Sequence, residues 1–187
     1  VSRIFIRDAI KALSYSGYLK VKQGKGAYVT ESAPKHEEIF SLISEIPDCP
    51  INYLMEVRVM FEGEFARLTA ERATQDEIEN ISDIFEEMKE AENVELFVMK
   101  DFQFHLAIAR ATHNPLMKTL MRIIGSLLFQ ETKNIVDKSV DTKGHTIDVT
   151  TELVQAFRDR DSEKAREKMI EHLQIIDHAL SDEDSSQ

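Results

Sequence analysis

The stretch VSRIFIRDAIKAL, residues 1–13, with GYLKV at 17–21 and GKGAYV at 24–29, decides the fold expected for the start of this chain. Ser2 is a favourable N-cap, and apolar residues follow it at helical spacing, which predicts a helix to about residue 16. The two later stretches are short, β-prone and joined by a glycine-rich turn, so they predict a β-hairpin. A helix followed by a basic hairpin is the second half of a winged helix-turn-helix.

Basic side chains mark the surface that this unit would turn toward double-stranded DNA. Arg3, Arg7 and Lys11 recur every fourth residue and therefore share one face of the predicted helix. The helix would enter the major groove, and the hairpin tip would lie along the backbone or in the minor groove. Charge alone fits a solvated basic helix beside an ordinary hairpin equally well. The residues expected to contact DNA are Ser2, Arg3, Arg7, Lys11, Lys22, Gly24 and Lys25.

The order of these residues resembles the recognition helix and wing of GntR-type transcription regulators. The family pattern is close to V-S-R-x-x-V-R-E-A-L, then G-L, then G-x-G-x-x-V, and its three parts occur in this order in the chain. It departs at Ile4 and Phe5, where a small Thr-Pro pair is usual, and at Asp8, where Glu is usual. The resemblance implies that two preceding helices are missing before Val1, so the N-terminal part of the DNA-binding domain lies upstream.

Charge divides the chain sharply. Its net charge is −11, yet residues 1–30 carry six basic side chains and one acidic one, whereas the remainder carries 17 basic and 33 acidic. The split indicates a small basic module joined to an acidic one. The single cysteine, Cys49, excludes an intramolecular disulfide and a Cys-rich zinc site. With no apolar run near the roughly 20 residues of a membrane span and no signal-peptide pattern, the sequence predicts a cytoplasmic protein without a membrane partner.

Outside the basic module, residues 1–30, the sequence predicts three further segments. A polar linker at 31–35 leads to an all-α domain at 36–181, and a polar tail follows at 182–187. The fold class is therefore mainly α, with half a winged helix-turn-helix followed by an antiparallel helical bundle. The helices expected in the second domain span 36–46, 51–72, 75–92, 94–112, 115–137, 146–159 and 162–181.

Three of these helices begin with recognisable capping residues. Thr74 and Glu77 form a capping box, in which each side chain satisfies the other residue's backbone N–H. Asn114 precedes a proline at the first helical position, where the missing N–H costs nothing. Asp161 is the expected N-cap of the last helix.

The acidic module resembles the effector-binding FCD domain of the FadR-like branch of the same family. That resemblance implies an all-α bundle that encloses a pocket and usually assembles as a homodimer. It rests on the order of several short motifs: YLMEVR at 53–58, AERAT at 70–74, DFQFH at 101–105, NPL at 114–116, RDRD at 158–161 and EHL at 171–173.

Asp101, His105 and His172 are polar residues on apolar stripes, where burial requires a partner. Their side chains are suitable ligands for zinc or another first-row divalent ion. From spacing alone, an Asp101–His105 hydrogen bond and a lone core histidine are favoured. The FCD resemblance implies instead that all three are metal ligands. It also implies a further histidine at the position of Thr150, so a site here would be limited to three ligands, weakened or empty.

Arg58 lies in the centre of the most apolar stripe of its helix, so its charge needs a matched partner. The guanidinium fits a carboxylate through two parallel hydrogen bonds, and Glu62, one turn away, could supply that carboxylate from within the helix. The FCD resemblance favours a pocket in which Arg58, together with Thr150, binds a small organic acid.

The sequence thus predicts a ligand-responsive bacterial transcription regulator and not an enzyme. The alternative is a helical-bundle metalloenzyme that uses Asp101, His105 and His172, since three protein ligands with an open position also suit catalysis. No nucleophile constellation is evident and the basic module would have no role in such an enzyme. A purely structural dimerisation module would leave the buried polar groups without a purpose.

Overall fold

A computed structural model describes residues 19–22, 26–29, 51–125 and 142–184. The chain divides into two compact units, residues 1–48 and 49–187. The expected recognition helix, the linker and the helix at 36–46 lie outside the described residues, so these remain predictions.

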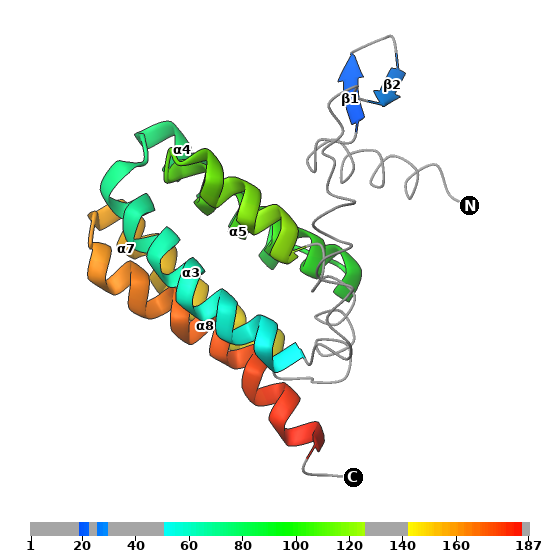
Figure 1. The fold of residues 1–187 in the computed structure, drawn as a ribbon, viewed down its shortest axis with the longest axis vertical. Helices are drawn as coiled ribbons and strands as arrows, with labels where there is room; N and C mark the ends of the chain where they lie inside the picture. The colour runs from blue at the N-terminus through cyan, green and yellow to red at the C-terminus, as the bar shows by residue number, and fades with distance from the viewer. Residues whose placement is uncertain (1–18, 23–25, 30–50, 126–141, 185–187) are drawn as a thin grey trace. The chain divides into compact units, whose positions relative to one another are not determined.

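In the first unit the predicted hairpin is confirmed. β1 (Leu19–Lys22) pairs antiparallel with β2 (Gly26–Val29), and Lys20 lies opposite Tyr28 in the register (Figure 1). Gly26 has a φ of 103°, a conformation that glycine adopts without the steric cost of a Cβ.

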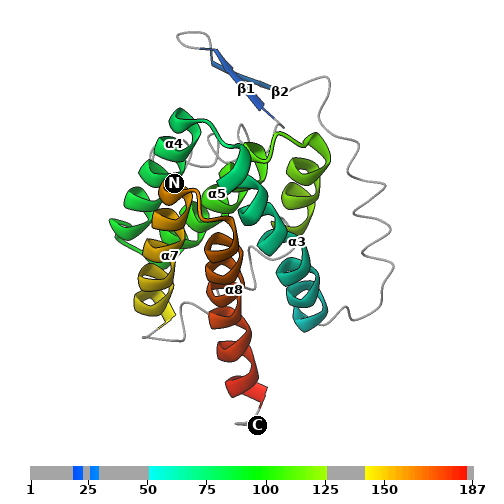
Figure 2. The ribbon, with the colours of Figure 1, turned by 90° about the vertical axis from the view of Figure 1, so that its left-hand side faces the viewer.

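The second unit is a helical bundle of two layers, as the sequence predicts. α3, α8 and α7 lie side by side in one layer, and α5 and α4 cover α3 and α7 respectively (Figures 1 and 2). The bounds are α3 Ile51–Arg72, α4 Gln75–Lys89, α5 Val94–Ala111, a helix at 115–125, α7 Thr142–Asp159 and α8 Ser162–Asp184.

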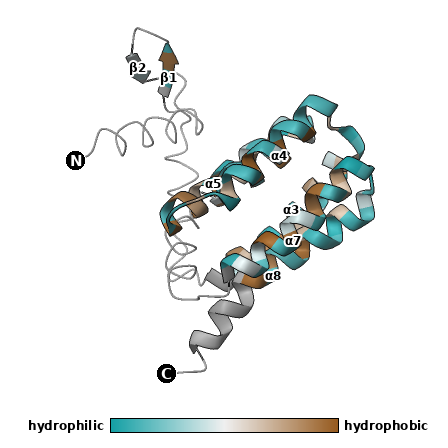
Figure 3. Cartoon of the chain, turned by 180° about the vertical axis from the view of Figure 1, so that it is seen from behind, coloured by the Kyte–Doolittle hydropathy of each residue, from teal (hydrophilic) through white to brown (hydrophobic). Residues whose placement is uncertain are grey.

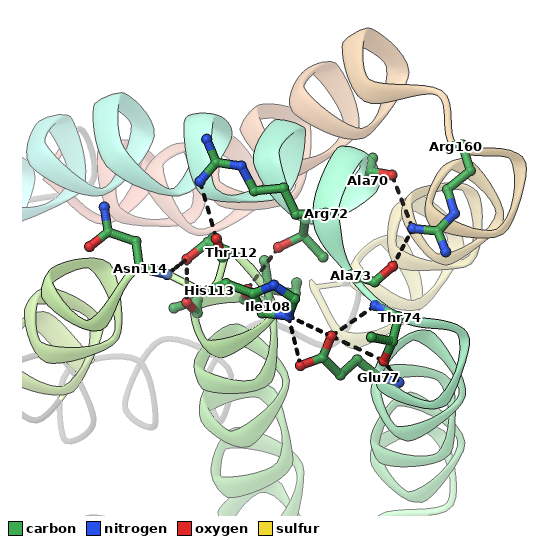
Figure 4. Close-up of polar contacts among 12 residues, drawn as sticks. Ala70, Arg72, Ala73, Thr74, Glu77, Ile108, Thr112, His113, Asn114 and Arg160 are labelled. Carbon is green, nitrogen blue, oxygen red and sulfur yellow. Dashed lines mark hydrogen bonds and ion pairs between the residues drawn. The ribbon is translucent and has the colours of Figure 1, made fainter.

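The predicted caps are present. The Thr74 side chain accepts from the backbone N–H of Glu77, and the Glu77 carboxylate accepts from the backbone N–H of Thr74 at 2.8 Å. Asn114 Oδ1 accepts from the N–H of Leu116, and Asp161 Oδ1 accepts from that of Lys164. Figure 4 shows the Thr74 box beside the end of α5, where the His113 ring contacts the Glu77 carboxylate.

Four helix boundaries differ from the expected ones, that of α5 only in that it ends at Ala111 and not at 112. α4 ends at Lys89 and not at 92, because Asn93 is needed in an extended conformation as the N-cap of α5. α7 begins at Thr142 and not at 146, since Lys143 anchors the first turn by donating to Ala91 O at 2.9 Å. α8 continues to Asp184, into the expected tail, because no glycine or proline ends it.

The core consists of the faces that the two layers turn toward each other. Figure 3 shows hydrophobic residues mainly on the inner sides of the helices and hydrophilic ones along the outer sides. The largest fully buried side chains include Phe65, Phe97, Phe104 and Phe157, which come from three different helices. Within the described ranges, no helix is both long and apolar enough to cross a membrane.

Candidate metal and ligand site

Asp101 and His105 on α5 meet His172 on α8 in the interior of the bundle. His105 Nε2 lies 3.0 Å from His172 Nε2, and Asp101 Oδ1 lies 3.6 Å and 3.3 Å from these two nitrogens. The structure therefore brings together the three residues that sequence reasoning proposed as ligands, and they form the one such cluster found among the described residues.

The spacing of these three atoms fits a divalent metal ion. Zinc holds nitrogen and oxygen ligands at about 2.0–2.2 Å, so neighbouring ligand atoms in a tetrahedral site lie roughly 3.3–3.6 Å apart. The three observed separations are close to that range. Asp101 Oδ1 is also buried and makes no hydrogen bond of good geometry to the described residues, which leaves it available to a ligand.

Arg58 and Glu62 of α3 complete the buried cluster. Arg58 Nε donates to Glu62 Oε1 at 2.5 Å, and Arg58 Nη2 lies 3.3 Å from His105 Nε2. The other carboxylate oxygen of Glu62 lies 2.5 Å from His105 Nδ1. Glu62 is 1% exposed and Arg58 is 5% exposed, so both charges depend on these contacts.

Glu62 is a site residue whose full role the sequence does not indicate. The sequence suggests it only as a partner for Arg58 within the same helix, at the edge of the apolar stripe. The ion pair with Arg58 does form, yet Glu62 also joins the guanidinium to His105. Its i+4 spacing from Arg58 was a usable signal, whereas its contact with a histidine 43 positions later depends on how α3 packs on α5.

Thr150 of α7 approaches the cluster through His172. Its hydroxyl donates to Thr146 O at 2.6 Å and lies 3.0 Å from His172 Nδ1. Thr150 is fully buried. It therefore contacts the side of the His172 ring that is turned away from Asp101 and His105.

Burial and the neighbouring charges shift the pKa values of four titratable side chains in the cluster. Burial alone would raise the pKa of Glu62, but the positive charges of Arg58 and His105 outweigh it and lower the pKa to about 2. The pKa of Asp101 is likewise held well below its usual range, since both histidines outweigh its burial. Burial opposes protonation of His105, yet Glu62 and Asp101 raise its pKa to about 9. Burial lowers the pKa of His172.

The residues expected to contact DNA are only partly described. Lys22 is exposed on β1, with Nζ 5.6 Å from the centre of the Tyr28 ring, and Lys20 is exposed on the same strand. The other six lie outside the described residues: Ser2, Arg3, Arg7, Lys11, Gly24 and Lys25.

Comparison with known proteins agrees with this architecture. Residues 53–175 match the FCD domain. The chain is 33% identical to the HTH-type transcriptional regulator LutR of Bacillus subtilis, across 97% of this chain and 85% of LutR. It is 26% identical to the Exu regulon transcriptional regulator of Escherichia coli K12, across 99% of this chain and 72% of that protein.

A solved structure named Streptococcus agalactiae GntR has the same fold, with a TM-score of 0.63 over 94% of this chain and 81% of that one, at 24% identity. The helical fold and these relatives together define a transcription regulator and not an enzyme. The chain belongs to the GntR family, in the FadR-like branch whose effector-binding domain is the FCD domain. The metalloenzyme alternative is therefore set aside.

Proposed function

We propose that this regulator binds double-stranded operator DNA as a homodimer and responds to a small organic acid bound in the helical bundle beside a divalent metal ion. Asp101, His105 and His172 would hold the metal, and Arg58 would bind the acid. The basic residues of the N-terminal unit would contact DNA in the cytoplasm. The observation that carries the proposal is the convergence of three ligand atoms and a guanidinium in one buried cluster.

The ligand set supports a metal ion with room for an exogenous ligand. Imidazole and carboxylate suit zinc and other first-row divalent ions, and three protein ligands leave a coordination position open. Such a metal would supply positive charge and a coordination position for an acidic effector. The FCD domain itself favours this assignment, because metal binding is common in the family.

Arg58 supports the choice of an acid. Its Nε is committed to Glu62, whereas among the described residues Nη1 contacts only Met55 Sδ, a weak acceptor, at 4.0 Å. Nη2 points to His105 Nε2, the same nitrogen that belongs to the ligand set. Arginine donors beside a metal locus are suited to a carboxylate. Thr150, on the far side of His172, would support the effector site through that histidine.

Effector binding would act on DNA through the packing of the bundle. The cluster joins α3, α5, α7 and α8, so a ligand that binds two packings with different affinity shifts their populations. In a dimer, such a shift would change the separation of the two DNA-reading helices, which operator half-sites require to be fixed. This coupling is reciprocal, so operator DNA would also alter effector affinity.

Elemental analysis of the purified protein and calorimetric titration with zinc test the metal assignment. We expect one bound metal ion, and loss of zinc binding in Asp101→Ala and in His172→Ala. His113→Ala is a matched control, because His113 is exposed and pairs with Glu77 far from the ligand set. Equal zinc affinity in wild type and Asp101→Ala would rule out this site.

A further inference from the structure

Thr150 presents a hydroxyl whose only proton is already committed. The hydroxyl oxygen lies 2.6 Å from Thr146 O, a distance at which two acceptors without a proton between them would repel. A carbonyl oxygen has no proton to give, so the Thr150 O–H donates to it. The same hydroxyl oxygen can then only accept from any further partner.

That further partner is His172 Nδ1, at 3.0 Å. Because the Thr150 oxygen accepts there, Nδ1 of His172 carries the proton. In a neutral imidazole the other nitrogen, Nε2, then carries the lone pair. Nε2 is the atom that lies 3.3 Å from Asp101 Oδ1 and 3.0 Å from His105 Nε2.

We propose that Thr150 is a positioning residue: it fixes the Nδ1–H tautomer of His172 and so directs the Nε2 lone pair toward Asp101 and His105. The use of this tautomer for metal binding rests on the proposed function, whereas the hydrogen bonds that fix the tautomer do not. A metal ligand needs an unprotonated nitrogen, and a hydrogen bond to the other ring nitrogen is the usual way to secure one. Thr150 thus supports the ligand set from outside and does not replace the missing imidazole within it.

Glu62 occupies the corresponding place behind His105. Its carboxylate lies 2.5 Å from His105 Nδ1, an ion-pair contact that favours a proton on that nitrogen although the two atoms do not have the geometry of a good hydrogen bond. Both supporting groups therefore favour a proton on Nδ1, with Nε2 facing the third ligand. The two supporting groups differ in charge, since Glu62 is anionic whereas Thr150 is neutral, so Thr150 can be removed without unpairing a buried charge.

The experiment compares three variants on α7 with wild type. Thr150→Val removes the hydroxyl at nearly constant volume, and Thr150→Ser keeps it. Thr151→Val is the matched control, because Thr151 Oγ1 makes the same type of bond, to Ile147 O at 2.8 Å, but is exposed. The readouts are the ¹⁵N shifts of the His172 ring in metal-free protein and zinc affinity by chelator competition.

We expect Nδ1–H and an unprotonated Nε2 in wild type, Thr150→Ser and Thr151→Val. Thr150→Val should lose this preference and weaken zinc binding by about 10–100-fold, the usual effect of removing such a partner. An Nε2–H tautomer in wild type would overturn the proposal without any variant, as would unchanged ring shifts in Thr150→Val. If wild type binds no zinc, the metal assignment fails, while the ring shifts still decide the role of Thr150.

Discussion

His105 Nε2 and His172 Nε2 lie 3.0 Å apart although 67 positions separate the two residues in the chain. Two unprotonated ring nitrogens at this distance would oppose their lone pairs, so something positive has to lie between them. A divalent cation held by both nitrogens would satisfy this requirement, and because a histidine ligates only through an unprotonated nitrogen, zinc affinity should fall as the pH falls.

Acid should destabilise the metal-free protein through Glu62 and Asp101. Both carboxyl groups have a folded-state pKa below the unfolded value, and that of Glu62 falls from 4.5 to about 2. Their contribution to the free energy of unfolding is therefore complete above pH 4.5 and is lost as the pH falls toward 2. For Glu62 the loss is on the order of 3 kcal/mol.

Urea denaturation in the presence of a chelator, from pH 6 to pH 2, measures this loss. Glu62→Gln is the comparison, since glutamine keeps the shape but cannot be ionised. We expect the stability advantage of wild type over this variant to shrink across the range. A difference that stays constant with pH would show that Glu62 has an ordinary pKa in the folded protein.

Gly125→Ala should destabilise the bundle by about 1–3 kcal/mol, the usual cost of overpacking. A Cβ at this position would overlap Phe102 Cε2 and lie 2.5 Å from Cδ2, and an aromatic ring cannot yield as a flexible chain end can. Thermal denaturation measures the cost. Phe102→Leu in the same background should recover part of it, whereas additive losses in the double variant would show that the two residues do not touch.

Arg160 sets a backbone cost against a side-chain gain. Its φ of 59° favours glycine, but Nη1 donates to Ala73 O at 2.5 Å and Ala70 O at 3.3 Å at the end of α3 (Figure 4). Charged hydrogen bonds contribute about 1.5–3 kcal/mol, whereas relief of the backbone is worth about 1–2 kcal/mol. Both Arg160→Ala and Arg160→Gly lose these hydrogen bonds, but only alanine keeps the cost of the backbone conformation. Arg160→Ala should therefore cost more stability than Arg160→Gly, and the order of their melting temperatures checks it.

The sequence predicts the helices better than it predicts the site. α3 has the expected bounds, and α4 begins at the expected residue because the Thr74–Glu77 capping box is a local signal. The ligand set was implied by family resemblance, since spacing on one helix cannot show what a second helix brings to it. The bond between Thr69 Oγ1 and Ile108 O, at 2.7 Å, is one of the contacts that fix α3 against α5, and no pattern in the sequence indicates it. The role of Glu62 follows from that packing.

Different basic residues should supply the sequence specificity and the overall affinity of DNA binding. We expect Arg7→Ala to lose preference for an operator selected from a random duplex library, because a guanine contact supplies about 1–3 kcal/mol of discrimination. Lys22→Ala should weaken binding to all duplexes and reduce the salt dependence, as expected for loss of a phosphate contact. Fluorescence anisotropy at matched salt distinguishes the two. An Arg7→Ala protein with full specificity would contradict the predicted recognition helix.

Arg58 should be required for the response to acids, but its removal alone would leave Glu62 short of a buried partner. Breaking such a pair costs about 3–5 kcal/mol, so Arg58→Met could lose its response merely by unfolding. The double variant Arg58→Met/Glu62→Gln removes both charges together and avoids that penalty. Arg58→Lys keeps a positive charge but loses the planar pair of donors.

Acetate, succinate and citrate serve as probes, with operator release and thermal stabilisation as readouts. At least one acid should release wild type from the operator and raise its melting temperature. The double variant should fold and bind operator, yet respond to none of them, and Arg58→Lys should respond only at higher concentration. A double variant that still releases the operator normally would place the acid elsewhere in the bundle.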